Sequence, residues 1–403
     1  MRYNAKSKKE GFILPLVIIV MVIMVTVGFG MLSLGYNARM LAVRQAEDTY
    51  SIAAAEAGVA HIVSRMNEKL AEDDEWDNTT LFTLNIPETE LPNSYSSYFV
   101  KISGDPTSGF VITSTGTCGI ATRTFYALTL LRGVFDYGIL ARNTITLKAG
   151  SSAMGYNLKT GEMGLSTILA TARTQGEGSI NLNGAYVNGS VLVGPYGNAD
   201  EMIVNEGVIT GIKGDMENFP KFPAVSPPSE LEDKGTIEGN VVLNGASGSG
   251  RYDGIVLKGA EALEIEGDVI LHVTGEIIVP HFTEIKIKEA SSLTLYVDGK
   301  FEVKDNAIIS NLTQRPEKFK LFGSAENPQE IIISTVHSNY NFYGAVYAPN
   351  AMVEMSVRGN LYGSFVCDSF ELNSPSTFYH DRSISKDINQ DGVYFGIGRW
   401  YEP

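Results

Sequence analysis

The chain has 403 residues, with 31 lysines and arginines against 46 aspartates and glutamates, and its formal net charge is −15 at pH 7. An acidic chain lacks the basic footprint that nucleic-acid binding requires, so we expect no nucleic-acid partner. The length is sufficient for two or three domains.

The first element is an apolar segment that follows a basic leader. Residues 12–38 contain no charged side chain, and Lys8 and Lys9 lie just before them. About 20 apolar helical residues span a bilayer core of about 30 Å, so this segment is long enough to cross a membrane. Positive residues before the span favour a cytoplasmic N-terminus. We therefore expect everything after the span to lie outside the membrane.

The helical pattern continues past the apolar segment. Apolar residues recur at intervals of mostly three or four, which predicts one helix over residues 12–70, membrane-spanning at first and amphipathic later. Such a helix is roughly 90 Å long at 1.5 Å per residue. The predicted apolar stripe consists of Ala38, Leu41, Ala42, Ala46, Tyr50, Ala53, Ala54, Ala57 and Ala60.

The N-terminal residues Lys8-Lys9-Glu10-Gly11-Phe12 resemble the class III signal of type IV pilins and pseudopilins. The resemblance implies that residues 1–11 are a leader, which a prepilin peptidase removes by cutting between Gly11 and Phe12. Phe12 then becomes a methylated N-terminus. The stretch from Glu47 through Ala53-Ala54-Ala55-Glu56-Ala57-Gly58 resembles the corresponding segment of PilX-type minor pilins.

One position of the assembly helix departs from the major pilins. These carry Glu at the fifth mature position, whereas this chain has Leu16 there. An unpaired carboxylate in lipid is costly, and in the family that Glu is thought to pair with a neighbour's N-terminal amine. The resemblance therefore implies a subunit that initiates a fibre or occupies its tip.

A small head is predicted over residues 71–132. Its first part is acidic and contains Pro87 and Pro92, so we expect a connector there. Three strands then follow, with turn residues between them. An antiparallel sheet of this kind would cover the apolar stripe of the helix. The predicted strands comprise residues 98–102, 110–113 and 122–131.

Residues 133–385 form a β-rich domain in this interpretation. Every second residue over 263–279 is apolar or glycine, and 293–303 repeats the pattern, as in half-buried strands. A β-sandwich or barrel and a parallel β-solenoid both fit, and we favour the solenoid. The whole chain is thus α+β: a long transmembrane and amphipathic helix, a small pilin-like antiparallel sheet, and a β-rich C-terminal domain.

Three further segments mark this region. Residues 342–351 and 361–365 resemble the bactofilin-like repeat domain found in some PilX-type proteins. Residues 219–229 are rich in proline, which excludes a central strand and predicts a surface excursion. Residues 386–403 are expected to form a C-terminal tail.

Two features are candidates for metal or covalent chemistry. Asp387, Asn389 and Asp391 have the D-x-N-x-D-G spacing of a calcium loop, but the twelfth position lacks the bidentate Glu. Cys118 and Cys367 could form a disulfide in an oxidising exterior or remain buried thiols. We expect no cofactor other than this calcium.

The chain lacks a nucleophile elbow, a phosphate loop and a zinc-binding HExxH motif, so we expect no enzymatic activity. The sequence predicts a minor pilin or pseudopilin that is processed by prepilin peptidase. It would leave the inner membrane for a pilus or the cell surface, with other pilins and the assembly platform as partners. The alternatives are a membrane-anchored β-helix protein that binds or cleaves glycans, and a bactofilin-like scaffold at the membrane.

Overall fold

The computed structural model describes residues 13–72, 84–105, 109–335, 340–384 and 394–402. They form two compact units. The first consists of Met1–Leu130 with Phe395–Pro403, and the second of Leu131–Tyr394. The second unit is therefore inserted into the chain of the first. The α+β class predicted from the sequence is confirmed: a long apolar helix, an antiparallel sheet and a large β-rich unit with parallel sheets.

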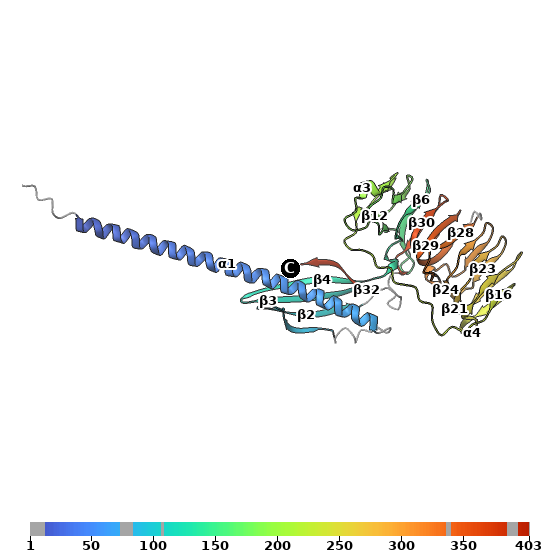
Figure 1. The fold of residues 1–403 in the computed structure, drawn as a ribbon, viewed down its shortest axis with the longest axis horizontal. Helices are drawn as coiled ribbons and strands as arrows, with labels where there is room; N and C mark the ends of the chain where they lie inside the picture. Colours follow the sequence, from blue (N-terminus) through green and yellow to red (C-terminus); the bar gives the residue numbers. More distant parts are fainter. Residues whose placement is uncertain (1–12, 73–83, 106–108, 336–339, 385–393, 403) are drawn as a thin grey trace, which may run out of the picture. The chain divides into compact units, whose positions relative to one another are not determined.

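The first unit is a single long helix with a five-stranded sheet on its C-terminal half (Figure 1). The pairs β1–β2, β2–β3 and β3–β4 are antiparallel, and β32 lies beside β4. Residues 394–401, predicted as part of a tail, instead form the last strand of this sheet. The elements are α1 (Ile13–Glu72), β1 (Ile86–Glu90), β2 (Ser96–Asp105), β3 (Gly109–Cys118), β4 (Ala121–Arg132) and β32 (Tyr394–Tyr401).

The sheet approaches α1 closely because two glycines remove side chains from the contact. A Cβ at Gly116 would collide with the backbone of Ser51 and Ala55, and one at Gly58 would collide with side chains of the sheet. The predicted apolar stripe is right only in part: Ala54 is buried and Ala57 half-buried, whereas Tyr50, Ala53 and Ala60 are exposed. The covered face combines small residues, which allow close approach, with Val59, Ile62 and Met66, whose burial excludes more apolar surface from water. The buried residues of this face are Ser51, Ala54, Ala55, Gly58, Val59, Ile62 and Met66.

The second unit is a parallel β-solenoid, and its strands stack coil upon coil (Figure 1). Strand pairs in three columns define three faces. The first face is, in spatial order, β15 (Lys213–Asp215), β12 (Gly189–Val193), β9 (Thr167–Thr171), β5 (Ile139–Ala141), β30 (Leu361–Leu372), β29 (Phe342–Val357), β27 (Phe319–Gly323), β24 (Ser292–Val297), β21 (Asp268–Val273) and β18 (Gly250–Tyr252).

The other two faces share the long strands β29 and β30. The second face is β13 (Ile203–Val204), β10 (Ile180–Asn181), β6 (Ile145–Leu147), β30, β29, β28 (Gln329–Thr335), β25 (Phe301–Val303), β22 (Ile277–Val279), β19 (Gly254–Val256) and β16 (Thr236–Glu238). The third is β14 (Val208–Ile209), β11 (Tyr186–Val187), β7 (Ser152–Asn157), β31 (Thr377–Asp381), β30 and β29. A separate four-stranded parallel sheet consists of β26 (Ile308–Asn311), β23 (Glu284–Ile287), β20 (Ala262–Glu266) and β17 (Val241–Asn244).

Short elements complete the unit at its turns. The strand β8 makes the one antiparallel pair recorded among the described strands here, with β7. These elements are η1 (Val134–Asp136), β8 (Glu162–Leu165), α3 (Ala199–Met202), α4 (Gly245–Gly248) and η2 (Pro316–Lys318).

The alternating residues predicted as half-buried form ladders inside the solenoid. Leu271 pairs with Leu295, and Leu295 pairs with Leu321; all three are buried. The repeat length varies: Leu263 and Ile285 are 22 positions apart, whereas Leu361 and Phe378 are 17 apart. This variation explains why the sequence shows no strict period.

The chain enters the solenoid in the middle of the stack. From β5 it proceeds to the end formed by β13, β14 and β15, then restarts at β16 at the opposite end and returns. Its last coil pairs with its first, because β30 pairs with β5 and β6 while β31 pairs with β7. Neighbouring first and last coils allow the whole solenoid to be inserted between β4 and β32.

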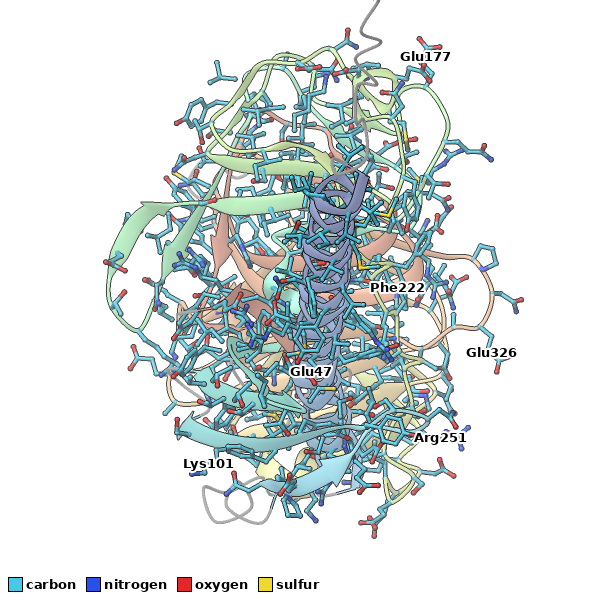
Figure 2. All side chains as sticks on the ribbon, turned by 90° about the vertical axis from the view of Figure 1, so that its left-hand side faces the viewer. Glu47, Lys101, Glu177, Phe222, Arg251 and Glu326 are labelled. Atoms are coloured by element: carbon cyan, nitrogen blue, oxygen red, sulfur yellow. The ribbon has the colours of Figure 1, made fainter. Side chains whose placement is uncertain are left out.

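The proline-rich excursion predicted at 219–229 is the crossover between the two ends of the stack. Nine strand spacings of about 4.8 Å separate β15 from β18, or about 43 Å. An extended segment of about 3.1 Å per residue covers that distance with the 20 residues 216–235. The segment packs Phe222 (labelled in Figure 2) and Val225 against an apolar cluster that includes Phe135. Proline suits this path because it favours extended backbone and needs no ladder hydrogen bond.

Candidate functional site

The N-terminal half of α1 is the most unusual surface in the described residues. Its apolar side chains are exposed, from Leu14 at 73% to Leu41 at 60%. The helix is long and apolar enough to cross a membrane, and no residue of its most apolar stretch is buried. No other helix or strand described in the first unit lies beside this half (Figure 1). It therefore needs lipid or other apolar helices around it.

The residues predicted for processing lie outside the described residues: Lys8, Lys9, Gly11 and Phe12. Leu16 lies at the start of α1 and is 62% exposed. Glu47 lies 31 positions later, about 46 Å along the helix at 1.5 Å per residue, so the structure does not bring these two together. Glu56 is exposed.

Glu47 is half-buried where α1 meets the turn between β3 and β4. Its carboxylate lies against Gly119, whose φ of +57° is a left-handed conformation that favours glycine. Figure 2 shows Glu47 on the helix. A Cβ at position 119 would collide with this carboxylate. Glu47 therefore sits at the contact between the helix and the head.

The adjacent residue Asp48 holds an ion pair that sequence reasoning missed. The Arg123 guanidinium donates to both oxygens of Asp48, with Nε–Oδ1 and Nη2–Oδ2 distances of 2.6 and 2.9 Å. Its Nη1 donates to Glu402 at 3.1 Å. One arginine thus joins α1, β4 and the end of the chain. No local pattern could reveal a pairing between residues 75 and 279 positions apart.

A second unpredicted contact closes the head at its other end. The side chain of Asn67 accepts from the Phe395 amide at 2.6 Å and donates to the Phe395 carbonyl at 3.1 Å. The Phe395 ring is buried and meets Phe110 edge to face at 5.4 Å. These contacts fix the returning strand β32 in the sheet.

Both cysteines are free, buried thiols. Cys118 ends β3 in the first unit, and Cys367 lies in the core of the solenoid. Burial raises the pKa of the Cys367 thiol, which keeps it protonated. The calcium-loop residues Asp387, Asn389 and Asp391 lie outside the described residues. Among the described residues, no group of three or more His, Cys, Asp or Glu side chains could hold a metal ion.

Buried polar groups cluster near the seam of the solenoid, where its last coil meets its first. Asp381 pairs in register with Tyr156, and both are buried. Burial raises the pKa of the Asp381 carboxyl and of the Tyr156 phenol. The neighbouring His380 donates its Nε2–H to the Phe135 carbonyl oxygen at 3.0 Å, and burial lowers its pKa to about 4. His380 is therefore neutral at pH 7.

A family model described as "Domain of unknown function (DUF7305)" matches residues 230–386, which cover the second run of the solenoid. No curated protein matches the chain. Among solved structures, the chain is similar to the crystal structure of the competence-associated pilin ComZ from Thermus thermophilus, at 13% sequence identity and a TM-score of 0.31. The match covers 89% of this chain and 97% of that one.

Proposed function

We propose that this chain is a minor pilin or pseudopilin that is cleaved by prepilin peptidase and assembled into a fibre, at or near its tip. The observation that supports this most strongly is the two-part helix α1. One half exposes apolar side chains and the other half is packed in its own head, without a break between them.

The exposed half of α1 accounts for both locations of such a subunit, in the membrane before assembly and in the fibre afterwards. Fully burying one large aliphatic side chain yields about 1.5–3 kcal/mol, so some twenty of them strongly favour an apolar surrounding. Lipid supplies that surrounding before assembly, and the helices of other pilins supply it afterwards. The partners are therefore other pilins, the assembly platform and the membrane.

Leu16 supports a position at the tip. A carboxylate at this depth would need a partner, whereas leucine needs none. The solenoid is then the displayed part, which caps the fibre, initiates it or adheres to a surface. The absence of a catalytic motif from the sequence supports a structural role rather than an enzymatic one.

Mass spectrometry of the native N-terminus tests this proposal. We expect a chain that begins at methylated Phe12 in membrane and sheared-surface fractions. Gly11→Ile should leave the leader attached and remove the chain from the sheared fraction. Ser7→Ala, a change in the same leader away from the cut, should be processed normally. A membrane fraction that contains the wild-type chain with Met1 intact would refute the proposal.

A further inference from the structure

A cavity of about 220 Å³ lies between the crossover segment and the first face of the solenoid. Its floor consists of outward side chains from successive coils, including Thr294 and Tyr296 of β24, Lys320 and Phe322 of β27, and Tyr347 of β29. The range 223–225 of the crossover forms one wall. A single water occupies about 10–15 Å³ of such space, so this cavity has room for a small organic molecule.

The apolar part of the floor is a row of rings in strand register. Tyr296 and Phe322 stack with ring centroids 5.0 Å apart, and Phe322 meets Tyr347 edge-on at 6.3 Å. The Tyr347 hydroxyl donates to the Pro223 carbonyl at 2.7 Å, which holds the crossover wall in place. These rings supply the aromatic, apolar part of the cavity lining.

The polar part of the floor is positive. Lys320 lines the cavity, and no ion pair joins its ammonium to a carboxylate of the described residues. Lys288, by contrast, lies 2.7 Å from Glu264. This ammonium of Lys320 favours an anion, and the neighbouring rings favour an apolar body.

We propose that this cavity binds a small organic anion, namely a carboxylate on an aromatic or short aliphatic body. The carboxylate pairs with the Lys320 ammonium, and the apolar body lies against Tyr296, Phe322 and the crossover wall. The cavity volume limits the body to about one ring with a short chain. This inference does not depend on assembly into a fibre, because the whole site lies within the solenoid.

Isothermal titration of the full chain in lipid nanodiscs, with empty nanodiscs as the blank, tests the site. The probe is 3-phenylpropionate, compared with 3-phenylpropan-1-ol and 3-phenylpropylamine, which have the same ring without the negative charge. We expect saturable binding of the carboxylate and at least about tenfold weaker binding of the other two, since hydrogen bonds to charged groups contribute about 1.5–3 kcal/mol.

Four variants locate the site. Lys320→Met should weaken carboxylate binding about tenfold or more, and Lys320→Arg should retain it, which separates lost charge from a damaged fold. Lys318→Met is the matched control, because Lys318 does not line the cavity, and it should bind normally. Thr294→Phe should fill the cavity and abolish binding. No saturable binding, equal binding of the alcohol, or unchanged binding by Lys320→Met or Thr294→Phe would overturn the proposal.

Discussion

Replacement of Phe395 by alanine tests whether the returning strand β32 completes the head. The Phe395 ring is 1% exposed and packs on Phe110. A buried Phe→Ala change costs about 3–5 kcal/mol, from lost burial and the remaining cavity. That is a large share of the 5–15 kcal/mol by which a typical protein is stable. We expect β32 to leave the sheet far more often in Phe395→Ala.

Hydrogen exchange of the full chain, read by mass spectrometry, measures this directly. Each 1.4 kcal/mol is a factor of ten, so amides of β4 should exchange about 10²- to 4 × 10³-fold faster in Phe395→Ala. Trp400→Ala is the matched control on the same strand, because Trp400 is 43% exposed, and it should change exchange by less than about tenfold. Amides of β21 in the solenoid provide an internal reference.

Two results would contradict this reasoning. If exchange in β4 stays within about threefold of wild type, β32 does not stabilise the sheet. If β21 accelerates as much as β4, the two units do not unfold separately.

Three further predictions concern the helix contact, the seam and the crossover. Gly116→Val should destabilise the head by at least about 1–3 kcal/mol, since its side chain would collide with the backbone of α1; exchange in β3 measures this. The lowered pKa of His380 means that its neutral form stabilises the fold above pH 6.5 and that this stability is lost as the pH falls to about 4. Urea unfolding should show a loss of about 3 kcal/mol in the free energy of unfolding, and His380→Gln should abolish this loss. The raised pKa of Asp381 has the opposite effect, because protonation of its carboxyl stabilises the folded protein as the pH falls. Tyr347→Phe leaves the Pro223 carbonyl without its donor and should cost about 0.5–1.5 kcal/mol, seen as faster limited proteolysis of the crossover.

Local patterns predicted much of the fold. The helix was expected over 12–70 and is observed over Ile13–Glu72, because charge-free and amphipathic stretches are visible in the sequence itself. Alternation over 263–279 predicted the strands whose inward residues form the ladders. The sequence favours parallel pairing over hairpins, and the ladders are parallel.

The phase of the helix face required the tertiary structure. Small alanines such as Ala53 and Ala60 satisfy a helical period as well as larger residues do, yet the sheet covers Val59 and Ile62. Which face is buried depends on where Gly116 and Gly58 permit close approach. That information lies in two glycines 58 positions apart, and no local window contains both.

The sequence alone determined that this chain has a long apolar helix and a β-rich remainder, because both follow from the spacing of apolar residues along one segment. Only the tertiary structure decided the long-range connections. It placed β32 beside β4 and the last coil of the solenoid beside the first, and it made the proline-rich stretch the crossover between the ends. Strand order and closure depend on which distant edges pair. Backbone hydrogen bonds carry no residue-specific signal for that choice, so it emerges only when the whole core packs.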